Sequence, residues 1–222
     1  MFFASTKNDE ETVVDLLSSS LRKDIAFGTL LPDQKLKLNE LRSKYGGSNH
    51  SMREALRLLS AEGLVEATAQ RGFRVTSATE NDLKDIFLVR VEIETIALTR
   101  AIELGGIDWE GYMIAAHHGL QKAESVVASY PDDLTALEWD KACSVFAKAL
   151  LQACDSSRLL DLHGKFFDQS RRYRLALLRE GKLDWEARKA RQRALLDSVL
   201  ARDTATAVQL LRQDIEAELK SA

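Results

Sequence analysis

The feature that most constrains this chain is its shortage of residues that interrupt helices. Only two prolines and 11 glycines occur among the 222 residues. Proline breaks a helix interior because it lacks a backbone donor, and glycine weakens one because it loses more conformational freedom on folding than any other residue. Long stretches without either residue favour long helices joined by short loops, so the sequence predicts a mainly α protein.

The N-terminal third differs from the rest, because its short helical patterns end in a pair of strand patterns. Apolar residues at helical spacing predict three helices, over residues 11–27, 36–45 and 48–61. Asn39 is a candidate cap of the second helix, and Ser48 is a candidate cap of the third. Two β patterns follow, at residues 64–68 and 72–76, around a turn at 69–71. Three helices and then a hairpin is the order of a winged helix-turn-helix.

From residue 80 onward the apolar spacing is helical almost throughout. It predicts six further helices, over residues 80–105, 109–129, 134–153, 157–181, 184–201 and 203–219. The best boundary falls at 76–79, where no periodic pattern continues. The sequence therefore predicts a winged domain at residues 10–78 and an all-α domain at residues 79–222.

Several classes of protein are not expected, because their signals are missing. No apolar run is long enough to span a bilayer and the N-terminus has no secretory pattern, which predicts a cytoplasmic protein without a membrane partner. No nucleophile elbow, P-loop, dinucleotide fingerprint or zinc-protease motif occurs, so no enzyme activity is expected. Cys143 and Cys154 fit no metal spacing and are expected to be free, buried thiols.

The charge distribution permits a DNA-binding N-terminal domain but does not indicate one. The whole chain carries a net charge of −3, so it is not a basic nucleic-acid binder as a whole. Residues 11–78 hold ten Lys and Arg against eight Asp and Glu, whereas residues 79–222 hold 20 against 24. An asymmetry this small arises often by chance, and the motifs must carry the argument.

Three stretches in order carry a family resemblance in the first domain. Residues 52–59 read MREALRLL, residues 61–65 read AEGLV and residues 71–75 read RGFRV. With Ile25, Gly28 and Pro32 before them, they resemble the winged helix of the GntR family of bacterial transcription regulators. The resemblance implies sequence-specific binding to double-stranded operator DNA, with repression as the mode of control. Since two half-sites about one helical turn apart demand a two-fold protein, a homodimer is expected.

The candidate DNA-binding residues lie on the third helix, just before it and on the hairpin. A recognition helix enters the major groove with its N-terminal end, where an Asn can pair with adenine and a Ser can reach bases or phosphates. The resemblance adds a wing tip that suits the minor groove. The candidates are Arg42, Lys44, Ser48, Asn49, His50, Ser51, Arg53, Arg57, Arg71 and Gly72. The family often has Arg at Asn49 and Pro at Ser51, so a non-standard operator is expected. Alternatively, Arg53, Glu54 and Arg57 form only a solvated helix face.

The second domain resembles the FCD effector domain of FadR-type GntR proteins, on the strength of Asp85-Ile86-Phe87 followed by Arg90 and Glu94. The resemblance implies an antiparallel helical bundle around a ligand cavity, in which one Asp and three His hold a metal. The positions in this chain that correspond to those ligands are Cys143, Ala147, Gln192 and Asp214. None of the three histidines remains, so neither a bound metal nor another cofactor is expected. His117, His118 and His163 match no ligand position, and surface or interhelix roles are expected for them.

In place of a metal, inward-facing polar residues predict a site for a small polar effector. These effector-site candidates are Arg90, Cys143, Gln192 and Asp214, with Tyr173 and Arg174 in addition. The fork of an arginine binds a carboxylate through two parallel bonds, so Arg90 is the expected anchor of an organic acid or an amino acid. Alternatively, Arg90 pairs only with Glu94, and residues 171–174 form a solvated face.

Within the family, a few short stretches resemble the carbon-starvation-induced type, which represses genes of γ-aminobutyrate and glutarate use. They are Glu138-Trp139-Asp140, Phe167-Asp168 before Arg172, and residues 200–205. That type keeps the histidines that this chain lacks, so its effector is not carried over. A different interpretation of the whole chain also stays open: a helical interaction or ligand-binding protein with a vestigial winged domain and no specific operator.

Overall fold

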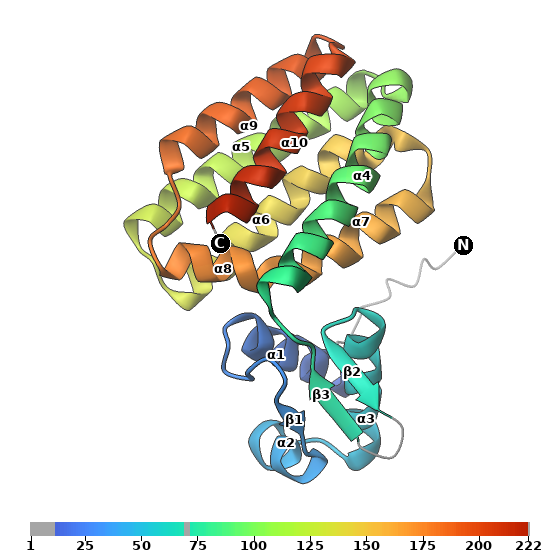
Figure 1. Cartoon of the computed structure of the whole chain (residues 1–222), viewed down its shortest axis with the longest axis vertical. Coiled ribbons are helices and arrows are strands. Elements are labelled where there is room, and N and C mark those ends of the chain that lie inside the picture. Colours follow the sequence, from blue (N-terminus) through green and yellow to red (C-terminus); the bar gives the residue numbers. More distant parts are fainter. Residues whose placement is uncertain (1–11, 69–71, 222) are drawn as a thin grey trace, which may run out of the picture. The chain divides into compact units, whose positions relative to one another are not determined.

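The computed structural model describes residues 12–68 and 72–221. The chain divides into two compact units, Met1–Ser77 and Ala78–Ala222 (Figure 1). The first is a winged helix-turn-helix and the second is a helical bundle, so the predicted fold class is confirmed. No described helix is long and apolar enough to cross a membrane.

The N-terminal unit packs three helices on one small sheet. Its elements are α1 (Val13–Ala26), β1 (Lys35–Leu36), α2 (Leu38–Tyr45), α3 (Asn49–Ala61), β2 (Val65–Thr68) and β3 (Gly72–Val75). The strands are antiparallel in the order β1-β3-β2. Leu21 of α1 and Met52, Leu56 and Leu59 of α3 are completely buried, which fixes α3 against α1. This core holds the start of α3 out toward solvent.

The predicted start of the second helix is wrong. Leu36 belongs to β1, where it is buried and pairs with Phe73 of the wing. The helix begins two residues later behind Lys37, which makes no side-chain cap, and Asn39 lies inside it. Leu36 and Leu38 fit a helical pattern and a strand end equally well, and pairing with β3 decided between them. Ser48 is confirmed as the cap of α3, because its hydroxyl accepts from the backbone N–H of Ser51 at 3.0 Å.

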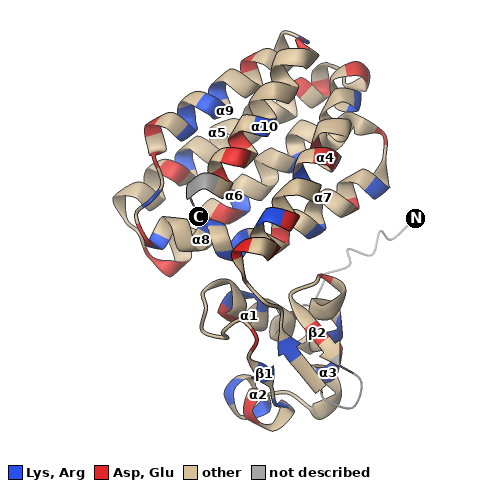
Figure 2. Cartoon of the chain, viewed as in Figure 1, with Lys and Arg blue, Asp and Glu red and all other residues tan. Residues whose placement is uncertain are grey.

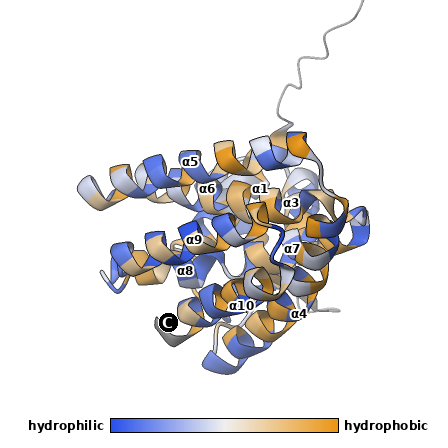
Figure 3. Cartoon of the chain, turned by 90° about the horizontal axis from the view of Figure 1, so that it is seen from above, coloured by the Kyte–Doolittle hydropathy of each residue, from blue (hydrophilic) through white to orange (hydrophobic). Residues whose placement is uncertain are grey.

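The C-terminal unit is helical throughout its described part. Its helices are α4 (Glu80–Leu104), α5 (Ile107–Ser129), α6 (Asp133–Leu151), the 3₁₀ turn η1 (Gln152–Cys154), α7 (Ser157–Gln169), α8 (Arg171–Arg179), α9 (Trp185–Leu200) and α10 (Thr204–Ser221). Helix α10 packs against α4 and α9, and α5 packs against α6. Figure 3 shows hydrophobic and hydrophilic residues on each of the long helices, as amphipathic packing requires. The apolar sides enclose a core around Leu98, Met113 and Trp139.

The single helix predicted over residues 157–181 is two helices, α7 and α8, which meet at Ser170. The Ser170 hydroxyl donates to the carbonyl of Phe167 at 2.8 Å and accepts from Arg174 Nη1 at 2.5 Å. Serine side chains that bond locally compete with the helical backbone pattern. Neither proline nor glycine occurs at this break, so the apolar spacing predicts one continuous helix across it.

The turn between α2 and α3 depends on Gly47. Its φ of +80° lies in the left-handed region, and a Cβ at this position would lie 2.9 Å from Cδ1 of Leu17 on α1. Gly28 also has a positive φ, of +70°, but an added Cβ there would meet no atom within 4 Å. Gly47 therefore combines a backbone requirement with a packing requirement, and Gly28 has only the first.

We expect Gly47→Ala to lower the free energy of unfolding by about 2 kcal/mol, because the Cβ adds a clash to an unfavourable φ. Gly28→Ala is the matched control and should cost about 1 kcal/mol, from the backbone alone. Urea titration of each full-length variant, followed by circular dichroism, measures both. Equal losses of unfolding free energy in the two variants would show that the contact between the added Cβ and Leu17 does not destabilise the protein.

Candidate functional site

The predicted DNA-binding residues that the structure describes lie on α2, on α3 and its cap, and at the start of β3. All of them are exposed except Ser51, which is partly buried. In Figure 2 the ribbon of this unit is coloured blue, for Lys or Arg, on parts of α1, α2, α3 and β3. Arg71 lies outside the described residues, so the wing tip is represented here by Gly72 alone.

Arg42 holds the first residue of α3 in place. Its Nη1 donates to Asn49 Oδ1 at 3.3 Å, and its Nε donates to the carbonyl of Gly47 at 3.3 Å. The acceptor of Asn49 is therefore engaged, and its amide NH₂ donates no hydrogen bond to the described residues. The Lys44 ammonium is 2.5 Å from Asp24 Oδ2, and this contact raises the pKa of Lys44, so that the lysine stays charged and the carboxylate offsets its charge.

Two serines and an arginine of the candidate set serve α3 itself. Ser48 and Ser51 form a reciprocal capping box, since the Ser48 backbone N–H donates to Ser51 Oγ at 2.9 Å. Arg57 pairs with Glu54 one turn away, as the solvated-face alternative predicts for these two residues. Arg53 takes no part in that pair. It lines an open groove together with Lys35, Lys37 and Gly72.

In the C-terminal unit, four of the six effector-site candidates line one cavity. Arg90, Cys143, Gln192 and Asp214 reach it from α4, α6, α9 and α10. The cavity measures about 40 Å³, and apolar side chains such as Leu120 complete its wall. A space of this size holds water, and a larger ligand enters only if some side chain moves.

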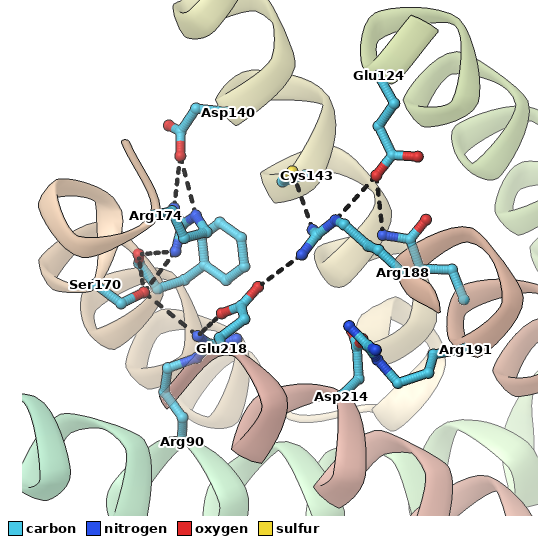
Figure 4. Close-up of polar contacts among 12 residues, drawn as sticks. Arg90, Glu124, Asp140, Cys143, Ser170, Arg174, Arg188, Arg191, Asp214 and Glu218 are labelled. Atoms are coloured by element: carbon cyan, nitrogen blue, oxygen red, sulfur yellow. Dashed lines mark hydrogen bonds and ion pairs between the residues drawn. The ribbon is translucent and has the colours of Figure 1, made fainter. Parts of the chain in front are cut away.

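A chain of buried ion pairs runs beside this cavity (Figure 4). Arg90 Nε lies 2.8 Å from Glu94 Oε1, and Arg188 Nε lies 2.9 Å from Glu124 Oε1. Glu218 of α10 joins the two arginines, with Oε2 at 3.2 Å from Arg90 Nη1 and Oε1 at 3.3 Å from Arg188 Nη1. Buried charges persist only when each is paired, so these contacts tie four helices together.

These ion pairs lower the pKa values of two buried acids, Glu94 and Glu218. Burial alone raises the pKa of Glu94, but Arg90 and His163 outweigh it and lower the pKa to about 2. Burial likewise opposes ionisation of Glu218, and Arg90, Arg188 and Arg174 outweigh it, so its pKa lies below the usual value. Both acids are therefore ionised near neutral pH, and their charges are part of the folded structure.

The other two effector-site candidates lie elsewhere. Arg174 is buried, and its Nη2 is 2.7 Å from Asp140 Oδ1, so the solvated-face alternative is wrong for Arg174. The Tyr173 hydroxyl is 3.5 Å from the carbonyl of Thr79, in the part of the unit where α4 begins. Neither residue lines the cavity. His163 is also buried, with Nδ1 at 3.2 Å from Glu94 Oε1, so it has an interhelix place and not a surface one.

Two residues beside the cavity were missed by the sequence reasoning. Arg188 lies one turn before Gln192, and Glu218 lies one turn after Asp214. Residues four apart share a helix face, so both face the cavity with the predicted residue. This spacing was the available signal.

The side chains at the cavity do not fit a metal ion. Ala147 offers no donor atom, and burial raises the pKa of the Cys143 thiol to about 12, which opposes the thiolate that a metal needs. The Arg188 guanidinium already lies beside it, with Nη2 at 3.5 Å from Cys143 Sγ, and would repel a cation. Within the described ranges, no three His, Cys, Asp or Glu side chains gather as metal ligands.

Comparisons with known proteins cover almost the whole chain. Residues 15–75 match the model described as bacterial regulatory proteins, gntR family, and residues 85–217 match the FCD domain. The chain is 38% identical over 198 residues to the HTH-type transcriptional repressor GlaR of Escherichia coli (strain K12), which covers 88% of this chain and 89% of that protein. It is 32% identical over 210 residues to the HTH-type transcriptional regulator BphR of Paraburkholderia xenovorans (strain LB400), covering 94% and 84%.

Solved structures share the fold at lower identity. E. coli McbR/YncC matches with a TM-score of 0.72 and 19% identity, over 93% of this chain and 94% of that one. A GntR transcriptional regulator from Rhodococcus sp. RHA1 matches with a TM-score of 0.71 and 20% identity, over 94% and 96%. At such identity the likeness concerns the arrangement of both units' elements and not their ligands.

The lowered pKa of Glu94 predicts a loss of stability in acid. Its ordinary pKa is 4.5 and its native pKa is about 2, so its contribution is complete above pH 4.5 and falls as the pH approaches 2. At neutral pH, Glu94→Gln should cost about 3 kcal/mol, because Arg90 loses its shortest ion pair. The cost should shrink in acid. Urea titrations from pH 7 downward test this, with exposed Glu92→Gln of the same helix as control. A pH-independent difference from wild type would contradict it.

The poor donor set predicts that the folded protein does not depend on a metal. Dialysis against a chelator should leave the melting temperature unchanged, because no described side chain loses a partner. Elemental analysis of the purified protein checks the same point. Stoichiometric zinc, nickel or manganese, lost together with thermal stability on dialysis, would overturn this prediction.

Proposed function

This chain belongs to the gntR family of bacterial regulatory proteins and carries that family's FCD domain, and from this premise we propose that it is a repressor whose hold on operator DNA is controlled by a small carboxylate effector. The observation that carries the DNA-binding part is the exposed N-terminal turn of α3, capped by Ser48 and oriented by Arg42. Repression is supported by the 38% identical relative, which is named a transcriptional repressor.

The cavity in the C-terminal unit supports a small acid as the effector. Arg90 and Arg188 supply two buried guanidinium groups at its edge, and arginine is the residue best suited to bind a carboxylate. Gln192 indicates that the effector also carries a hydrogen-bond donor. Its Nε2 donates to Glu124 Oε1 at 3.2 Å, which leaves Oε1 as an acceptor without a hydrogen-bond partner among the described residues. An acid that also carries a hydroxyl or an amino group fits this pair of features.

We expect the working form to be a homodimer in the cytoplasm. A winged helix reads one half-site, and a two-fold protein reads a palindrome with both recognition helices in successive turns of the major groove. Large apolar side chains exposed on α4, namely Leu88 and Ile96, suit a contact between subunits. Sedimentation analysis at micromolar concentration tests this, and a monomer there would contradict the dimer.

Arg53→Ala should weaken binding to the protein's own promoter region by roughly 10- to 100-fold, because one arginine contact with a base or a phosphate is lost. Arg193→Ala is the matched control: it removes an exposed arginine of α9 that pairs with Asp197, far along the chain from α3. Fluorescence anisotropy at about 150 mM salt, against random DNA of equal length, measures both.

Two results would count against the proposal. Equal affinity of wild type for promoter and random DNA would remove sequence-specific regulation altogether. If wild type binds the promoter specifically and Arg53→Ala binds it equally well, only the role assigned to Arg53 is contradicted.

A further inference from the structure

The two ion pairs by which Glu218 joins Arg90 and Arg188 are the longest arginine–carboxylate pairs of the described buried cluster. Their distances of 3.2 and 3.3 Å exceed the 2.8 and 2.9 Å that join the same arginines to Glu94 and Glu124. Charge-assisted bonds of good geometry are shorter, near 2.7–2.9 Å. Each arginine thus keeps its better carboxylate partner if Glu218 leaves.

From this geometry we propose that Glu218 is an internal carboxylate that occupies the effector's anion site, and that a small carboxylate ligand binds between Arg90 and Arg188 by displacing it. The inference rests on the proposed function, because it names how the same cavity takes its effector. Glu218, Arg90 and Arg188 all line that cavity, and Figure 4 shows Glu218 between the two arginines.

The charges of the fully buried groups favour exchange over simple addition. Among the described residues, three buried arginines, Arg90, Arg174 and Arg188, face four buried carboxylates, Glu94, Glu124, Asp140 and Glu218. A fifth buried carboxylate would add negative charge that no further buried arginine among the described residues could pair, which is costly. Replacing one carboxylate by another leaves the balance unchanged. The small volume of the cavity also favours exchange over addition, because a ligand larger than water can enter only if a side chain leaves.

Among these four acids, Glu218 is the one that can leave at the lowest structural cost. It lies in the last turn of α10, which ends at Ser221, and 9% of its surface is exposed. The other three lie within α4, α5 and α6 and are at most 2% exposed. Terminal turns of helices open more readily than helix centres. Ligand binding would therefore be coupled to release of the end of α10 from α4 and α9.

The test is chemical rescue of full-length Glu218→Ala by sodium acetate, with sodium chloride at equal ionic strength as reference. Removal of the internal carboxylate should lower the melting temperature, and millimolar acetate should raise it again by about 3 °C as it fills the vacated site. Wild type should respond less, because Glu218 competes. Exposed Glu92→Ala on α4 is the control and should respond as wild type does.

An acetate response of Glu218→Ala no larger than that of wild type overturns the proposal. Should Glu218→Ala not fold, Glu218→Gln takes its place, since it keeps the bulk and removes the charge. Acetate binding, followed by the broadening of its NMR signal, should then be tighter than in wild type, and equal binding overturns the proposal. Promoter binding by acetate-free wild type is measured in parallel. If wild type binds its promoter specifically but acetate does not rescue Glu218→Ala, only the displacement of Glu218 is contradicted. If acetate rescues the variant but wild type does not prefer its promoter, the proposed regulator function is contradicted.

Discussion

The C-terminal unit depends on pairing charges that have been taken out of water. Three arginines and four carboxylates are buried there among described residues, and each ion would cost several kcal/mol if it lost its partners. Glu218 joins α10 to α4 and α9, and Asp140 of α6 holds Arg174 of α8. The same need for partners explains the break at Ser170, whose hydroxyl accepts from both Arg90 and Arg174. The unit is therefore specified by a polar cluster as well as by its apolar core.

The N-terminal unit is held together mainly by a small apolar core. This core includes Met52 and Leu56 and anchors α3, and the first turn of this helix is exposed. Ser48 caps the helix, and Arg42 fixes the side chain of Asn49 from the preceding turn. These polar residues of the unit lie at the surface, whereas Ser51 is partly buried.

The predictions from sequence succeeded where one local pattern had one structural solution. The long helices followed from apolar spacing, and the Ser48 cap followed from a serine directly before such a pattern. They failed where two solutions suited the pattern. Leu36 fitted a helix start or a strand, and residues 157–181 fitted one helix or two. In both cases the decision came from partners distant along the chain, Phe73 for Leu36 and Arg90 for Ser170.

The sequence by itself determined the two-part organisation, the helices and hairpin of the first unit, the exposed start of α3 and the inward direction of Arg90, Cys143, Gln192 and Asp214. Each of these follows from periodicity or from a family motif within a short stretch. The tertiary structure alone decided that Arg188 lies beside Cys143 and that Glu218 lies between two arginines. Helix faces can be read from spacing, but which charge meets which depends on how α4, α9 and α10 pack, and no local pattern records that packing.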